Sequence, residues 1–111
     1  EQIPQSAGIV GLAPALAYVE AHYQDPIAVE ALAGMTHYSE RQFLRLFKEA
    51  TGQTPLQYII RLRMQNARTL LWNTELSVTE IAGRCGFSDS NYFSKLFTRQ
   101  NGMTPREYRR R

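Results

Sequence analysis

Apolar residues recur at the spacing of α-helices along most of this chain, which predicts an all-α protein. Residues 54–73 form the longest such stretch, with Thr54 placed as an N-cap and Pro55 at the first helical position. A helix over residues 55–72 is roughly 27 Å long, because each residue adds about 1.5 Å, and can hold two small units apart. Its expected apolar face is Leu56, Ile59, Ile60, Met64, Ala67, Leu70 and Leu71. Its expected polar face is Gln57, Arg61, Gln65 and Arg68.

The segment before this stretch is expected to hold three shorter helices. Residues 1–11 contain proline and glycine without a sustained period, which predicts a linker or a disordered N-terminal segment. A first helix is predicted from Leu12, where Pro14 is acceptable because it lies in the first turn. Two more are predicted over about 29–35 and 39–51. The second of these ends before a C-terminal glycine.

The same plan is expected to recur after the long helix. Ser77 and Glu80 have the spacing of a capping box, as Ser39 and Gln42 do in the first half. A longer helix is predicted over about 89–100, and a last short one from the second Thr-Pro pair. Residues expected to face inward in the short and long helices are Leu12, Leu16, Val19, Tyr23, Leu32, Ala33, Phe43, Leu46, Phe47, Ile81, Ala82, Tyr92, Phe93, Leu96 and Phe97.

The two halves form an internal repeat. Gly52-x-Thr-Pro-x-x-Tyr-x-x-Arg61 matches Gly102-x-Thr-Pro-x-x-Tyr-x-x-Arg111, with identical residues at identical spacing. Each copy contains a short helix, a turn and a longer helix with a polar or basic outer face. This is the helix-turn-helix plan, in which the second helix enters the major groove of DNA.

The predicted fold class is therefore all-α and homeodomain-like, with about seven helices in two helix-turn-helix subdomains joined by a long central helix. The expected boundaries are 1–11 for the N-terminal segment, 12–53 and 74–111 for the two subdomains, and 54–73 for the connecting helix. The connecting helix is expected to set the separation of the two recognition helices near the roughly 34 Å of one DNA turn.

Composition narrows the class of protein further. The chain has 111 residues, of which 43% are hydrophobic, and no apolar run approaches the roughly 18 residues of a membrane span. We therefore expect a protein with no membrane partner, located in the cytoplasm and associated with the nucleoid. The single cysteine, Cys85, excludes an internal disulfide and a cysteine-based metal cluster, and is expected to be a small buried hydrophobe. No cofactor is expected.

The charge is unevenly distributed. Residues 1–60 carry three basic and six acidic side chains, whereas residues 61–111 carry ten basic and four acidic ones. The three basic residues of the first half all lie in the predicted helix over 39–51. A basic surface suggests a polyanionic partner, although a solvated surface would have the same composition.

Three motifs give the sequence a family resemblance over about residues 12–111. They are Ile81-Ala-Gly-Arg-Cys-Gly-Phe87, Asn91-Tyr-Phe-Ser-Lys-Leu-Phe97 and Gly102-Met-Thr-Pro-Arg-Glu-Tyr108. With these, the chain resembles the DNA-binding domain of the AraC/XylS family of bacterial transcription regulators. The resemblance implies two recognition helices in successive major-groove segments on one face of double-stranded DNA, and an asymmetric binding site. It also implies a separate effector or dimerisation domain, expected N-terminal to this fragment.

Differences between the two repeats predict that the first subdomain is the less stable one. Ala28 and Ala31 stand where the second repeat has its capping box, and loss of a cap costs about 1 kcal/mol. His37 stands where the second repeat has Gly86, at a turn position that often needs a positive φ.

Candidate DNA contacts follow from the exposed edges of the two predicted recognition helices. In the first, Arg41 and Arg45 suit guanine O6 and N7, and Lys48 suits phosphate. Gln42 suits adenine or its capping role equally well. In the second, Asn91 suits adenine and Lys95 suits guanine or phosphate. The remaining candidates are Ser90 and Ser94 on the exposed edge, and Thr98 and Arg99 as backbone contacts.

Other residues keep plainer interpretations. Leu44 offers apolar contact to a thymine methyl group or belongs to the core, and Trp72 is expected to be core packing. The terminal residues 109–111 either grip phosphate or form a disordered tail.

Enzymatic activity is not expected, because no nucleophile-base set, carboxylate pair or phosphate-binding glycine loop is present. The alternative function is a helical protein-interaction module without DNA binding, with RNA polymerase as a candidate partner.

Overall fold

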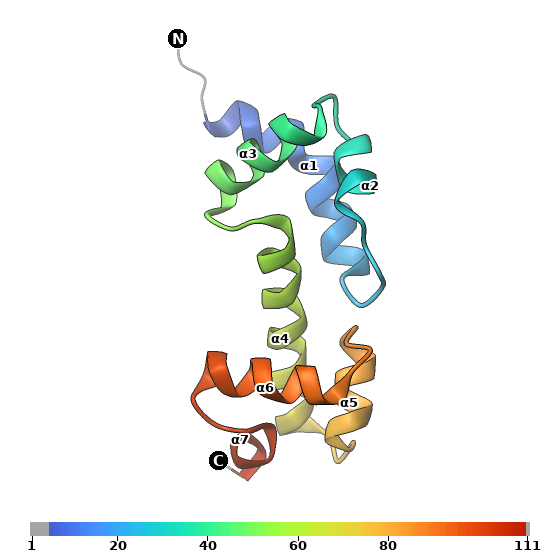
Figure 1. The fold of residues 1–111 in the computed structure, drawn as a ribbon, viewed down its shortest axis with the longest axis vertical. Helices are drawn as coiled ribbons and strands as arrows, with labels where there is room; N and C mark the ends of the chain where they lie inside the picture. The colour runs from blue at the N-terminus through green and yellow to red at the C-terminus, as the bar shows by residue number, and fades with distance from the viewer. Residues whose placement is uncertain (1–4, 111) are drawn as a thin grey trace. The chain divides into compact units, whose positions relative to one another are not determined.

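The computed structural model describes the backbone of residues 5–110 and the side chains of residues 10–110. The regular elements of the described residues are all helices, with no strand among them, as predicted (Figure 1). The helices are α1 (Gln5–His22), α2 (Val29–Gly34), α3 (Glu40–Thr51), α4 (Pro55–Asn73), α5 (Val78–Arg84), α6 (Ser90–Asn101) and α7 (Pro105–Arg110).

The chain divides into two compact units, which we call unit 1 (Glu1–Ile60) and unit 2 (Arg61–Arg111). The division falls inside α4, within the predicted connecting helix of residues 54–73. Each unit therefore uses one part of the same continuous helix to complete its core.

In unit 1, α1 packs against α2 and α3. Phe43 and Phe47 of α3 are fully buried, with ring centroids 5.6 Å apart. Phe47 and Tyr58 also pack at nearly a right angle, with ring centroids 5.4 Å apart. Full burial of side chains this large stabilises the fold by roughly 1.5–3 kcal/mol each, so these rings fix the inward face of α3.

Unit 2 repeats this arrangement. Phe93 and Phe97 of α6 are fully buried, with centroids 5.7 Å apart, and Phe97 meets Tyr108 at 5.5 Å. Each of these rings lies 50 positions after its counterpart in unit 1. The sequence repeat is thus a repeat of core packing.

The predicted N-terminal linker is wrong for residues 5–11, which belong to α1, while residues 1–4 lie outside the described residues. Pro14 consequently lies inside the helix and not in its first turn. Gly11 is explained by packing, because a Cβ atom at this position would collide with the hydroxyl of Tyr38. The glycine that suggested a break thus allows a close approach between α1 and the side chain of Tyr38, in the turn before α3.

Three residues predicted to face inward are exposed: Leu56 is 61% exposed, Trp72 is 60% and Tyr92 is 51%. Each directly adjoins a buried residue, namely Pro55, Leu71 and Phe93 in turn. Successive helical residues differ by about 100° around the axis, so at the edge of a buried face one of two neighbours points into the core and the other into solvent. Leu44, which adjoins Phe43, is exposed for the same reason and is not part of the core.

The two helix-turn-helix turns are built differently. Gly86 has φ of 106°, as the second turn requires, whereas no non-glycine residue in the described chain has a positive φ. The expectation that His37 takes this conformation is therefore wrong. In the first turn the Thr36 hydroxyl donates to Ala33 O at 2.7 Å and accepts from Tyr38 N at 3.2 Å. A side chain thus closes the turn that glycine closes in unit 2.

Helix caps follow the sequence closely. The predicted capping boxes at Ser39 and Ser77 are both present, and Ala28 makes no side-chain cap at the start of α2. Gly52 and Gly102 end α3 and α6 with φ of 80° and 76°. Local interactions therefore define both ends of α3, the start of α5 and the end of α6.

Two further capping boxes open α4 and α7, at the repeated Thr-Pro pairs. Thr54 N donates to Gln57 Oε1 at 2.9 Å, and Thr104 N donates to Glu107 Oε1 at the same distance. The threonine hydroxyls accept in return from the backbone of Gln57 and Glu107. The Thr-Pro part of the sequence repeat therefore caps the N-terminus of the helix that follows it.

We expect Ser77→Ala to lower the free energy of unfolding by about 1 kcal/mol, because it removes the acceptor for Glu80 N, now at 3.0 Å. Urea unfolding followed by circular dichroism measures this. Ser88→Ala, at an exposed serine in the following turn, is the control and should leave the midpoint unchanged. Equal effects of the two substitutions would contradict the capping role.

Candidate nucleic-acid interface

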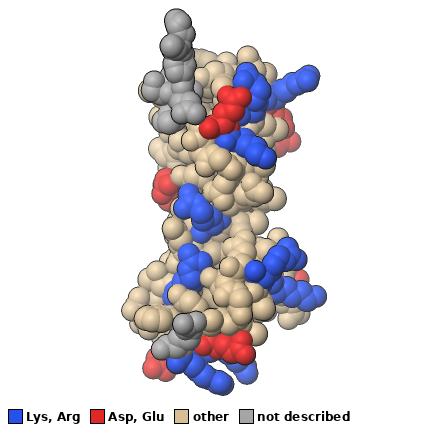
Figure 2. Space-filling view, turned by 90° about the vertical axis from the view of Figure 1, so that its left-hand side faces the viewer, with Lys and Arg blue, Asp and Glu red and all other residues tan. Residues whose placement is uncertain are grey.

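The candidate residues of α3 all reach solvent. Arg41, Gln42, Arg45 and Lys48 are exposed, on the side of α3 opposite to its buried phenylalanines. Figure 2 shows Lys and Arg side chains projecting from the surface. The basic residues of unit 1 are thus held on a helix whose other face is anchored in a core.

Gln42 is engaged in capping. Its Oε1 accepts from Ser39 N at 3.3 Å, while its own backbone N–H donates to the Ser39 hydroxyl at 3.2 Å. Bidentate pairing with adenine uses both the amide oxygen and the amide nitrogen. The amide oxygen is already bonded to Ser39 N. Of the two roles left open by the sequence, adenine pairing and capping, the structure therefore favours capping.

The candidates of α6 separate into two groups. Asn91, Lys95 and Arg99 are exposed along one line of the helix, whereas Ser90, Ser94 and Thr98 are half-buried. Thr98 donates its hydroxyl to Ser94 O at 2.8 Å, within the helix itself. The projecting edge of α6 is therefore formed by the first group.

Tyr92 is a candidate that the sequence reasoning missed. It corresponds to exposed Gln42 at the 50-residue offset, and its ring packs against Phe87 with centroids 6.2 Å apart. The Asp89 carboxylate accepts from Tyr92 N at 3.4 Å and from Asn91 N at 2.8 Å. Applying the repeat to Gln42 would have placed Tyr92 on the exposed edge.

An ion pair lies on the exposed face of α3. Arg45 Nη1 is 3.3 Å from Glu49 Oε2, one turn further along the helix. The side chains are 60% and 57% exposed. The guanidinium that the sequence assigned to base reading therefore has a carboxylate partner on its own helix.

Cys85 is fully buried at the end of α5, as predicted. Burial raises the pKa of its thiol to about 11, and the positive charge of Arg63 acts in the opposite direction. A thiol with this pKa is almost entirely protonated near neutral pH, which makes it a poor nucleophile or metal ligand. Cys85 therefore contributes to the packing of the core where α5 ends and the second turn begins.

Arg109 is neither a free tail residue nor placed to grip phosphate. Its guanidinium donates to the backbone carbonyls of Leu71 at 3.1 Å, Thr74 at 3.3 Å and Leu76 at 2.6 Å. These carbonyls lie at the C-terminal end of α4 and in the segment that leads to α5. Arg110 is exposed, and Arg111 lies outside the described residues. Arg109 thus ties α7 to the end of α4.

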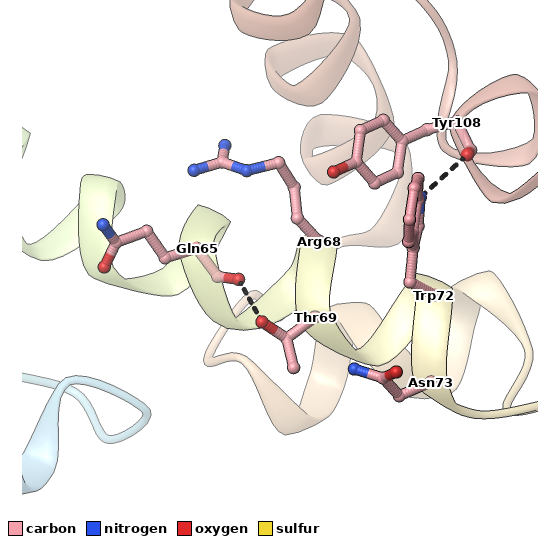
Figure 3. A pocket seen from close by; sticks show the side chains of 6 residues that line it. All are labelled: Gln65, Arg68, Thr69, Trp72, Asn73 and Tyr108. Atoms are coloured by element: carbon pink, nitrogen blue, oxygen red, sulfur yellow. Dashed lines mark hydrogen bonds between the residues drawn. The ribbon is translucent and has the colours of Figure 1, made fainter. Parts of the chain in front are cut away.

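A shallow hollow of about 510 Å³ lies between α4 and α7 of unit 2. Figure 3 shows its lining residues Gln65, Arg68, Thr69, Trp72, Asn73 and Tyr108. The Trp72 indole donates to Tyr108 O at 3.2 Å, which holds the ring at the surface. Arg68, which was expected on the polar face of this helix, is half-buried and donates to Asn101 Oδ1 at 3.3 Å.

Neither a metal cluster nor a membrane span occurs in the described part of the chain. No cluster of three or more His, Cys, Asp or Glu side chains able to hold a metal ion occurs there. No described helix combines the length and the apolar character that a bilayer crossing requires.

These features define the class of the protein. Each unit presents a short helix, a tight turn and a longer helix that is anchored by buried phenylalanines and exposes polar or basic residues. This is the helix-turn-helix arrangement, present here twice.

Comparison with known proteins assigns the family. A model of the family described as "Helix-turn-helix domain" matches residues 32–111. The HTH-type transcriptional activator RhaS of Escherichia coli is 45% identical over 109 residues, which cover 98% of this chain and 38% of that protein. The chain thus spans well under half the length of this curated relative.

Solved structures agree with this assignment. The DNA-binding domain of AdpA, determined in complex with a target DNA, matches with a TM-score of 0.83 and 39% identity over 89% of each chain. An AraC-type regulator from Chromobacterium violaceum matches with a TM-score of 0.83 and 35% identity over 94% of this chain and 93% of that one. The chain belongs to the AraC/XylS family of transcription regulators, which are not enzymes.

We expect Arg109→Ala to lower the free energy of unfolding by about 1–3 kcal/mol, since it leaves three backbone carbonyls without their donor. Arg110→Ala is the matched control, because it removes the same charge from an exposed neighbour, and should change stability by less than about 0.5 kcal/mol. Chemical denaturation of both variants measures the difference. Similar losses in the two variants would show that Arg109 acts only through its charge.

Proposed function

We propose that this chain binds double-stranded DNA in a sequence-specific manner, with α3 and α6 as recognition helices in successive major-groove segments. The observation that carries the proposal is the repeated anchoring of α3 and α6 by buried phenylalanines, which leaves a polar or basic edge exposed on each. A rigid helix with projecting polar side chains is what major-groove reading requires. The DNA in the AdpA complex supports the same partner for this chain.

Roles follow from the exposure of each side chain. Arg41 and Arg45 of α3, and Asn91 and Lys95 of α6, are assigned to base edges because they lie in the N-terminal halves of their helices. Positions later in each helix are assigned to phosphate, namely Lys48 in α3 and Arg99 in α6. The half-buried residues Ser90, Ser94 and Thr98 take secondary contacts, and Gln42 acts mainly as a cap.

The continuous helix α4 is assigned a coupling role. It runs from Pro55 to Asn73 and contributes to the cores of both units. We assign to it the joining of the two recognition helices into one reader of an asymmetric site. Gln65, exposed near the middle of α4, is not one of the assigned DNA contacts.

The wider role is that of one domain in a larger transcription regulator. The chain covers 38% of RhaS, a transcriptional activator, which leaves room in such a protein for an effector or dimerisation domain N-terminal to this segment. We assign RNA polymerase as a second partner of the whole regulator. The location assigned to it is the cytoplasm, in association with the nucleoid.

The test is binding to duplex DNA as a function of salt. Selection from a random duplex pool first supplies a cognate site. If roughly six to eight phosphates are neutralised, log K should fall with log salt at a slope of about −5 to −7. A flat salt dependence, or no selected sequence, would favour a protein-interaction module instead.

The same assay separates base contacts from phosphate contacts. Arg45→Ala and Lys95→Ala should each weaken the cognate complex by about 1–3 kcal/mol and random DNA much less, because a lost base contact is sequence-dependent. Lys48→Ala is the comparison, and should weaken both complexes by a similar factor and reduce the salt slope by about one. Uniform losses in all three variants would show that none of these side chains reads a base.

A further inference from the structure

Glu49 is an unexpected residue on a helix that is proposed to enter the DNA groove. It is exposed on α3, directly after Lys48, where phosphate is the expected partner. A carboxylate at this position repels the DNA backbone. The residue must therefore either lie away from DNA or contribute something that offsets the repulsion.

The second repeat shows that the position does not require an acid. Arg99 corresponds to Glu49 at the 50-residue offset, and it is exposed on α6. The residue one turn earlier is Arg45 in α3 and Lys95 in α6. Unit 1 thus has an arginine followed by a carboxylate, where unit 2 has two positive charges in the same places.

The geometry indicates what the carboxylate contributes. Glu49 Oε2 accepts from Arg45 Nη1 at 3.3 Å, so it engages one corner of the guanidinium. A guanidinium has five N–H donors in a rigid plane, and two of them suffice for guanine O6 and N7. Fixing one corner restricts the rotation of the plane and leaves donors for a base edge. A lysine gains less from such a partner, because its ammonium has no fork to orient.

We propose that Glu49 is a positioning residue that determines specificity, by orienting the Arg45 guanidinium toward one guanine and by repelling phosphate from the same arginine. The proposal rests on the proposed function, since it requires Arg45 to meet a base. It assigns different tasks to the two recognition helices. The Arg45–Glu49 pair of α3 favours discrimination. Arg99, which takes the place of Glu49 in α6, adds affinity for any sequence and leaves Lys95 to its base edge.

The experiment compares binding to the selected site, to that site with its Arg45-dependent base pair replaced, and to random duplex. Glu49→Gln should raise affinity for random duplex by about two- to fivefold, the range of a surface ion-pair effect. It should lower the ratio of cognate to substituted-site affinity by a similar factor. The far-ultraviolet circular dichroism spectrum should be unchanged, because both side chains are exposed. Glu49→Ala is a second variant and should have the same effects on binding.

Glu40→Gln is the matched control. It removes the same charge from the first turn of the same helix, at another exposed glutamate. It should change the affinities for cognate and substituted sites by equal factors. A change in discrimination with Glu49→Gln but not with Glu40→Gln separates orientation of Arg45 from a general charge effect.

The Arg45→Ala background gives the decisive comparison. If Glu49 acts through Arg45, Glu49→Gln in that background should leave the discrimination ratio unchanged. An unchanged ratio in the single variant, or an equal change without Arg45, would overturn the proposal while leaving DNA binding intact. A wild-type chain that does not distinguish the selected site from random duplex would overturn the proposed function and this inference together.

Discussion

Burial of two phenylalanines one turn apart is the interaction on which each half of this molecule depends. Phe43 and Phe47 in α3, and Phe93 and Phe97 in α6, are fully removed from solvent. Because they lie at i and i+4, they fix the rotation of the helix about its own axis as well as its attachment. The opposite face of each helix is then left exposed to solvent, and this exposed face is the polar edge. The position of every proposed DNA contact follows from this packing.

The helix ends complete the definition of the recognition helices. A capping side chain starts each one, Ser39 in α3 and Asp89 in α6, and a left-handed glycine ends each one. The turns before them reach similar results by different means, with Thr36 hydrogen bonds in unit 1 and Gly86 in unit 2. The repeat therefore conserves a geometry while its chemistry varies. The same variation extends to the exposed faces, where Glu49 and Arg99 carry opposite charges.

Most of the helices could be predicted from the sequence because their signals are local: capping pairs, terminal glycines and apolar spacing. Faces were harder to predict, since a run of adjacent apolar residues does not show which one is buried. Leu56, Tyr92 and Trp72 are such cases: each is exposed beside a buried neighbour, at the edge of the buried face of its helix. Gly11 and Arg109 depend on residues distant in the sequence, Tyr38 and the end of α4, which periodicity cannot reveal. Of the candidate site, the exposed basic residues were predictable, whereas the Arg45–Glu49 pair required coordinates.

We propose above all that α3 and α6, joined through the continuous helix α4, read a single DNA site as one unit. The most direct measurement uses a selected site with about five base pairs, half a helical turn, inserted between the segments that α3 and α6 contact. Its affinity is compared with that of the original site. Because the insertion turns one segment to the opposite face of the duplex, the affinity should fall toward that for random DNA. An inserted site bound as tightly as the original would show that one recognition helix accounts for specific binding and would contradict the claim.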